Sequence, residues 1–396
     1  MSVSLGWLFA LSGTVVYSGE FIASMGAVAT GYIPQQWHIY LLGVASVVVA
    51  SALNTVWIRI LPALTKFMVF FVNIVAIFIF ITLLAKTHPK ASAKSVFVDV
   101  VNETGWSSDG LVFLIALLPG VSLISLFDGA AHLAEELPRP DKQVPQVMIL
   151  TNILNAISVI VMLIVLLFCL THPETLLEPI AGLPIIQLCW DAWPSVGFVT
   201  TVALCYSIVQ ILACMSILFA SSRLFWSFAK TGAFPFSRWM SQVDRRFKVP
   251  ANAVNVTAVL ASLITLLVLG SSTVLNALFG SAVILMAIAY STPIILLLLK
   301  GRSVLPESRS FSLGRLGPVV NVMALCWIAL ISVFLSFPIY KPVTADTMNW
   351  AAPFALGCLA LVLVNWFFCK KSYRLLHGLY VEGLHGAVLA GLESGK

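Results

Sequence analysis

Long apolar stretches separated by short polar loops run through the whole chain. A helix that spans a membrane needs about 20 mostly apolar residues, or more when it is tilted. With that window the sequence predicts about ten spanning helices, in the ranges 4–29, 38–59, 62–85, 111–136, 146–170, 194–222, 251–270, 273–299, 318–339 and 350–369. The pattern therefore predicts an all-α, polytopic membrane protein.

The composition supports this class and excludes others. Only 10% of the 396 residues are charged, whereas a soluble domain has about 25%. The net charge of +6 requires no nucleic-acid partner, because cytoplasmic loops of membrane proteins collect Lys and Arg. The seven cysteines lack metal-ligand spacing, and no P-loop, hydrolase or metalloprotease signature appears. We therefore expect no metal site, no cofactor and no enzymatic activity.

The Lys and Arg residues predict an orientation. With a cytoplasmic N-terminus, only four of them fall in outer segments, namely Lys86, Lys90, Lys94 and Lys341. Because positive charge collects on the cytoplasmic side, we expect both termini there, in a multi-pass protein of the plasma membrane. Asn102, in the sequon Asn102-Glu103-Thr104, then lies in an outer loop and is a candidate for glycosylation.

The segment 117–146 departs from the apolar pattern. It begins as a membrane helix but carries Phe127-Asp128-Gly129 at membrane depth. An ionisable residue at that depth costs several kcal/mol and usually persists for function. Backbone without helical hydrogen bonds is tolerated there only where it lines a cavity or is buried in protein. The segment therefore predicts the broken helix of a transporter.

A broken helix exposes backbone N–H groups to anions and carbonyl groups to cations. Asp128 adds a negative charge suited to an ammonium, an amine or a proton. Gly129 permits backbone angles closed to other residues, and Phe127 offers an aromatic face for a gate or a quaternary amine. His132, one turn on, is a titratable neighbour. Alternatively, Asp128-Gly129 only caps a short helix and His132 is a packed polar residue.

Further polar residues interrupt other predicted spans. Tyr17 and Glu20 lie near the middle of the first span. Glu20 is either a proton-coupling or cation-binding carboxylate facing a cavity, or a neutral Glu hydrogen-bonded between helices. Asn276 and Gly280 interrupt the span 273–299 and form either a pocket wall or a packing notch.

Charged residues also mark the predicted inner membrane interface. Glu135 and Glu136 end the broken helix, and Arg223 ends the span 194–222 at similar depth. They form either a salt bridge that closes an inner gate or separately solvated charges, since exposed pairs gain little.

Several of these stretches resemble a known family. FDGAAHLAEELPRPDKQVPQVM at 127–148 resembles the sixth segment of fungal permeases of the amino acid/choline/GABA transporter family, part of the amino acid–polyamine–organocation superfamily. SRLFWSFAKTGAFPFSRWMSQVDRRFKVP at 222–250 is similar to the loop after that family's eighth segment, although Lys230-Thr231 replace its usual basic-acidic pair. GRLGPVVNV at 314–322 and MNWAAP at 348–353 resemble the eleventh and twelfth segments.

The resemblance implies two inverted repeats of five helices, a midplane site between them, and two further helices. The predicted spans match segments three to twelve, so the N-terminal tail and the first two segments, with half of the site, are expected to be missing. The implied division is 1–85, a remnant of the first repeat; 111–300, the second repeat; 317–369, two additional helices; and 370–396, a cytoplasmic tail.

Together these observations predict a proton-coupled secondary transporter of amino acids or related amines such as choline or GABA. Its partners are a small-molecule substrate, the lipid bilayer and a coupling proton. The alternative is a truncated, transport-inactive permease that acts as a partner of a full-length one. The expected substrate-binding residues are Tyr17, Phe127, Asp128, Gly129, Asn276 and Gly280, and the expected coupling or gating residues are Glu20, His132, Glu135, Glu136 and Arg223.

Overall fold

The computed structural model describes residues 1–134, 137–234, 236–270, 274–305, 310–344 and 347–370. These residues form helices and turns, and no strand occurs among them. The α-helices are α1 (Ser2–Thr30), α2 (Gln36–Asn54), α3 (Leu61–Lys86), α4 (Ala93–Phe97), α5 (Asp109–Ile115), α6 (Leu117–Leu123), α7 (Gly129–His132), α8 (Pro140–Cys169), α9 (Pro184–Ala192), α10 (Val196–Lys230), α11 (Ser237–Met240), α12 (Ala251–Thr265), α13 (Val274–Lys300), α14 (Gly317–Phe334) and a last helix, Ala351–Lys370. Short 3₁₀ turns are η1 (Ile58–Ile60), η3 (Pro173–Leu177), η4 (Ile180–Gly182), η5 (Leu266–Leu269), η6 (Arg302–Val304) and η7 (Gly314–Leu316).

In the described part of the chain, nine helices are long and apolar enough to cross a membrane. They are α1, α2, α3 with η1, α8, α10, α12 with η5, α13, α14 with η7, and the helix Ala351–Lys370. Each falls on one of the predicted spans, although some ends are shifted by more than one helical turn, since α8 begins at Pro140 and not at 146, and α10 ends at Lys230 and not at 222. The chain is therefore an all-helical, multi-pass membrane protein, as the sequence predicts.

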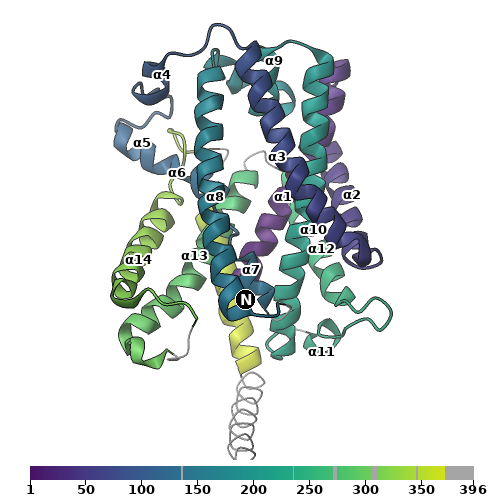
Figure 1. The fold of residues 1–396 in the computed structure, drawn as a ribbon, viewed down its shortest axis with the longest axis vertical. Helices are drawn as coiled ribbons and strands as arrows, with labels where there is room; N and C mark the ends of the chain where they lie inside the picture. The colour runs from purple at the N-terminus through teal and green to yellow at the C-terminus, as the bar shows by residue number, and fades with distance from the viewer. Residues whose placement is uncertain (135–136, 235, 271–273, 306–309, 345–346, 371–396) are drawn as a thin grey trace, which may run out of the picture.

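Helix α1 occupies the centre of the bundle (Figure 1). It packs against α2, α10, α12 and α13. In its most apolar stretch 78% of the residues are buried inside the protein, compared with 6% in the corresponding stretch of α8. A helix that is apolar on all sides and surrounded by others belongs to the protein interior. Polar residues on α1 therefore face other helices or internal cavities, and not lipid.

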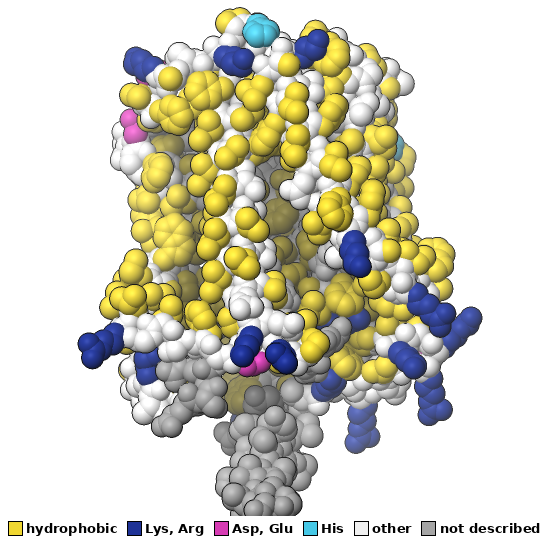
Figure 2. Space-filling model, viewed as in Figure 1, with side chains coloured by type: hydrophobic (Ala, Val, Ile, Leu, Met, Phe, Trp, Pro, Cys, Tyr) yellow, Lys and Arg dark blue, Asp and Glu magenta, His cyan; other side chains and the backbone are white. Residues whose placement is uncertain are grey.

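The outer helices present apolar side chains to their surroundings. Large hydrophobic residues such as Phe70 and Ile81 on α3, and Leu150 and Leu154 on α8, are exposed. Figure 2 shows hydrophobic side chains as a yellow band, with Lys and Arg concentrated at the end of the bundle where α11 lies. We call this the α11 end and the opposite one the α9 end (Figure 1). An apolar band with charged ends is the surface that a bilayer requires.

The predicted span 111–136 is the one that is not a continuous helix. It consists of α5, α6 and α7, separated by Ala116 and by residues 124–128. Pro119 accounts for the first interruption, because it has no N–H for the carbonyl of Ile115, where α5 ends. Helix α6 lies nearer the α9 end and α7 nearer the α11 end (Figure 1). The second interruption therefore lies inside the bundle.

Candidate functional site

The break between α6 and α7 begins earlier than the sequence predicts. Helix α6 ends at Leu123, and Leu126 has a left-handed backbone with φ 66°. Gly129 is the first residue of α7 and does not have a positive φ, so the expected special backbone angles at Gly129 are wrong. Its lack of a side chain serves close packing instead, because an added Cβ would lie 3.3 Å from Cη2 of Trp7.

Side chains of the protein donate hydrogen bonds to two backbone carbonyls at the end of α6. The hydroxyl of Ser125 donates to the carbonyl of Val121 at 2.6 Å. The amide of Asn155, from α8, donates to the carbonyl of Leu123 at 2.7 Å. These bonds satisfy groups that a helix end leaves unpaired. The expectation that the broken end presents free carbonyls to a substrate is therefore wrong for these two groups.

Asp128 is the centre of a buried polar cluster, which we call the Asp128 cluster and define as Trp7, Asp128, His132 and Tyr290. Oδ2 of Asp128 accepts a hydrogen bond from Nε1 of Trp7 at 3.1 Å and one from the hydroxyl of Tyr290. Nε2 of His132 lies 2.6 Å from the same oxygen. Asp128 is 4% exposed. The cluster thus joins α1, α7 and α13 through one carboxylate oxygen.

This geometry bears on both readings of Asp128. Asp128 occupies the N-cap position of α7, but its side chain makes no capping hydrogen bond. Its side chain is therefore not a helix cap. Because Oδ2 already has three partners, an ammonium ligand would have to compete with those partners at that oxygen.

Two cavities lie on either side of the break. The first, of about 500 Å³, is lined by α1, α5, α6 and α13, and we call it the α6 cavity. Tyr17, Ser122, Asn276 and Phe279 line it, and no hydrogen bond of the Ser122 hydroxyl is found within the described residues. The sequence singles out Tyr17 and Asn276, and the structure brings them together here.

The second cavity, of about 650 Å³, is lined by α1, α3, α7 and α10, and we call it the α7 cavity. Trp7, Lys66, Leu126, Gly129 and Leu133 are among its lining residues. Residues of the break line it from one side, while α6 faces the other cavity. Residues 124–128 connect Leu123, which lines the α6 cavity, to Gly129, which lines the α7 cavity, and we call this segment the partition.

A third hollow, of about 1030 Å³, lies near the second half of α1, and we call it the vestibule. Both Glu20 and Tyr17 line it, and Tyr17 also lines the α6 cavity. The ring of Tyr17 lies 5.7 Å from that of Phe279, a residue of the α6 cavity. Glu20 is half-buried and has no hydrogen-bond or ion-pair partner within the described residues. It is therefore not hydrogen-bonded between helices, which was one of its two expected roles.

The remaining expected site residues lie elsewhere. Gly280 is buried, and an added Cβ would lie 2.7 Å from Cβ of Ala351, so it is a packing notch. Phe127 is 38% exposed and lines none of these three cavities. The side-chain amide of Asn102 donates to the carbonyl of Trp106 at 2.8 Å and to Asp109 at 3.0 Å.

The proposed inner gate is only partly visible. Arg223 is buried, because α10 continues two turns beyond it to Lys230. Its guanidinium lies 4.1 Å from the ring centre of Phe219. The reading of Arg223 as a solvated interfacial charge is therefore wrong. Glu135 and Glu136 lie outside the described residues.

Sequence reasoning missed Trp7 and Tyr290 as members of the Asp128 cluster. They lie 121 and 162 positions from Asp128. The available signal was chemical, because a buried Trp or Tyr usually needs a partner for its N–H or O–H. That signal marks such residues as candidates but does not identify the partner.

Comparison with known proteins places the chain in a family. Residues 1–362 match the family model that is described as amino acid permease. Over 382 residues the chain is 29% identical to a choline transporter of Saccharomyces cerevisiae, covering 93% of this chain and 67% of that protein. It is 29% identical over 373 residues to an uncharacterized amino-acid permease of Schizosaccharomyces pombe, covering 93% and 69%. It is 30% identical over 298 residues to an amino-acid permease of Arabidopsis thaliana, covering 72% and 56%.

The family match extends over all the long apolar helices except part of the last one. The relatives carry transporter and permease names, which agrees with an interior of cavities on both sides of a broken helix. The chain therefore belongs to the amino acid permease family and is a multi-pass transmembrane transporter, and not an enzyme.

Proposed function

We propose that the chain is a secondary active transporter, driven by protons, for an amino acid or a related small amine such as choline. The observation that carries this proposal is the pair of cavities separated by the break. Alternating access requires a binding site that is opened to one side of the membrane and then to the other. The α6 and α7 cavities, with residues 124–128 between them, have that arrangement.

The α6 cavity is the proposed substrate site. Its volume of about 500 Å³ falls in the range of small-molecule sites, which bind mostly through apolar walls and a few polar groups. Tyr17 and Asn276 supply those polar groups, and Ser122 lies in the wall beside them. Most other lining residues are apolar.

The Asp128 cluster is the proposed coupling element. Histidine is the residue type that most often serves as a proton-dependent switch in proteins, and His132 belongs to the cluster. Because Nε2 of His132 lies 2.6 Å from Asp128, a gain or loss of its proton changes the strength of that contact. The contact holds α7, so proton binding would bias the position of the partition.

The orientation follows from the charge distribution. Lys and Arg gather at the α11 end, which would therefore face the cytoplasm, with the α9 end outside. We place the protein in the plasma membrane, so that the vestibule and the α6 cavity face the medium.

Uptake by purified protein in sealed liposomes tests the proposal. Radiolabelled choline and a mixture of labelled amino acids are offered with and without an imposed pH gradient. We expect accumulation of at least one substrate that depends on the gradient. Asp128→Asn should abolish it, whereas Asp109→Asn, an exposed position at the start of α5, should not. No uptake above empty liposomes by monodisperse wild-type protein would refute transport.

A second variant separates coupling from binding. His132→Gln keeps a hydrogen-bond donor beside Asp128 but cannot titrate. It should retain exchange of internal for external substrate while losing accumulation driven by the pH gradient. Gradient-driven accumulation equal to that of the wild type would show that His132 is not the coupling group.

A further inference from the structure

The vestibule lies at one end of the bundle between α1, the start of α2 and the loop around η4. Its volume of about 1030 Å³ exceeds that of either cavity beside the break. Glu20 and Tyr17 line it from α1, one turn apart and therefore on one face of the helix. Tyr32 and Trp190 line it from the loop after α1 and from α9.

The charge of the vestibule has one sign. Its lining includes two carboxylates, Glu20 and Glu178, and no Lys, Arg or His among the described residues. A half-buried carboxylate without a partner is costly unless a cation or a proton joins it. Glu20 has no such partner within the described residues, as noted above. With Glu20 ionised, the vestibule therefore attracts cations and repels anions.

Aromatic side chains favour one kind of cation. Tyr17, Tyr32 and Trp190 line the same hollow as Glu20. The face of a Trp or Tyr ring attracts an ammonium group, and quaternary ammonium ions are bound by several such rings together. A hard inorganic cation such as Ca²⁺ or Mg²⁺ requires several oxygen ligands, which ring faces do not supply.

We propose that the vestibule is a capture site for an organic monocation without a carboxylate group, such as a quaternary or primary amine, with Glu20 as its anionic partner. This inference deepens the proposed function, on which it rests, because it narrows the substrate class. A zwitterionic amino acid brings a carboxylate, and the vestibule offers it two like charges and no cationic side chain.

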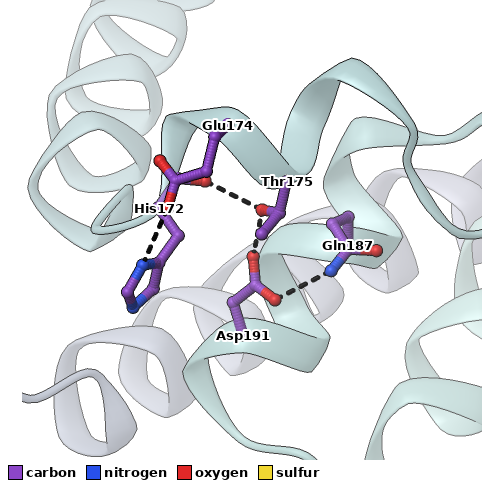
Figure 3. Close-up of polar contacts among 5 residues, drawn as sticks. All are labelled: His172, Glu174, Thr175, Gln187 and Asp191. Atoms are coloured by element: carbon purple, nitrogen blue, oxygen red, sulfur yellow. Dashed lines mark hydrogen bonds and ion pairs between the residues drawn. The ribbon is translucent and has the colours of Figure 1, made fainter.

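A hydrogen-bond network holds the wall of the vestibule in place (Figure 3). The carbonyl oxygen of the Gln187 side chain accepts a bond from N–H of Ile180 in η4 at 3.1 Å. The amide of Gln187 donates to Asp191 at 2.8 Å, and Asp191 accepts from Thr175 at 2.6 Å. The vestibule is thus pre-formed, which reduces the entropic cost of ligand binding.

The backbone of this wall has an uncommon conformation. Ala181 has φ 55° and Gly182 has φ 74°, and both line the vestibule. A non-glycine residue adopts a positive φ only where the surrounding structure enforces it, commonly at binding sites. The network around Gln187 provides that enforcement next to Ala181.

Tyr17 connects the capture site to the proposed substrate site. It lines both the vestibule and the α6 cavity, and its ring lies against Phe279 on the cavity side. The Tyr17 and Phe279 pair therefore lies on the proposed route of a cation from Glu20 to the α6 cavity.

Equilibrium binding to the full chain in detergent tests the proposal. The probes are tritiated choline and glycine betaine, which carry the same trimethylammonium group, although only betaine adds a carboxylate. We expect choline to bind at least tenfold more tightly than betaine. Excess NaCl at a constant ionic strength should compete far less than unlabelled choline. Equal affinity for betaine, or displacement by Na⁺ at the choline concentration, would overturn the proposal.

Matched variants assign the effect to Glu20. Glu20→Gln removes the charge and keeps the shape, and should weaken choline binding at least tenfold, which is about 1.4 kcal/mol. Glu20→Asp should retain most of the affinity. Glu174→Gln is the control, since Glu174 is exposed in the same loop region but does not line the vestibule. Unchanged binding by Glu20→Gln would refute the assignment.

The outcomes for binding and transport are separable. Choline binding that depends on Glu20, without uptake in liposomes, would support the capture site and refute the transport function. Conversely, uptake and choline binding that are both unaffected by Glu20→Gln would support the transport function and refute the capture site. Should Glu20→Gln not yield monodisperse protein, the preference of the wild type for choline over betaine still decides the substrate class.

Discussion

Removal of a single hydroxyl from the Asp128 cluster should measurably loosen the partition. In Tyr290→Phe the ring remains in place on α13, and only the donor to Oδ2 of Asp128 is lost. Trp7 and His132 still contact that oxygen, so the carboxylate is not left without partners. The substitution therefore isolates one bond between α13 and α7.

The size of the effect follows from the charge of the acceptor. A hydrogen bond to an ionised group contributes about 1.5–3 kcal/mol, compared with about 1 kcal/mol for a neutral pair. At 1.36 kcal/mol for each factor of ten, this loss corresponds to an increase of about 10- to 150-fold in the population with α7 undocked from α13. Helix α7 has only four residues, so few other contacts compensate.

Unfolding in mixed micelles of a mild detergent and increasing sodium dodecyl sulfate measures this loss as a change in the free energy of unfolding. A double-mutant cycle with Asp128→Asn then isolates the pairwise part, which we expect to be about 1 kcal/mol or more. Tyr40→Phe is the matched control, because Tyr40 lies outside the Asp128 cluster. A Tyr290→Phe loss no greater than that of Tyr40→Phe, or strict additivity with Asp128→Asn, would refute the bond as a determinant of α7 docking.

Three further substitutions test other parts of the structure. Asn155→Leu removes the donor to the carbonyl of Leu123 and should lower the free energy of unfolding by about 1 kcal/mol, measured in the same micelle titration. Gly280→Val places a Cβ 2.7 Å from Cβ of Ala351 and should cost about 1–3 kcal/mol, whereas Gly357→Ala, which has nothing within 4 Å, should cost far less. Gln187→Leu breaks the network at the vestibule wall, and should speed proteolytic cleavage of the loop and weaken choline binding; wild-type values for both would count against a pre-formed wall.

The long apolar helices are the part of the fold that the sequence predicts best. Length and hydropathy alone determine whether a segment can span a bilayer, so nine helices fall on predicted spans in the described part of the chain. The interruptions depend on local chemistry as well. The sequence analysis places the interruption at Phe127-Asp128-Gly129 and overlooks the break after Ile115, which the missing N–H of Pro119 explains. The helix end at Leu123 and the left-handed Leu126 have no comparable signal in the sequence.

The candidate site is less predictable, because its members come from distant segments. Asp128 and His132 lie one turn apart, so their proximity follows from helical spacing. Trp7 and Tyr290 reach the same oxygen only through the packing of α1 and α13, which the sequence does not specify. Gly280 is predicted as a possible site residue because it interrupts an apolar span, but in the structure it packs closely against Ala351.

The contrast between Asp128 and Glu20 shows how partner count decides the role of a buried acid. Both are carboxylates in apolar spans, and the sequence treats each as a candidate for binding or coupling. Asp128 is 4% exposed and its Oδ2 has three protein partners, so a ligand at that oxygen must replace interactions already made. Glu20 is half-buried, lines a cavity of about 1030 Å³ and has no partner within the described residues. A bound cation therefore stabilises the protein more at Glu20 than at Asp128. A change in protonation affects the structure more at Asp128, because it alters contacts among three helices.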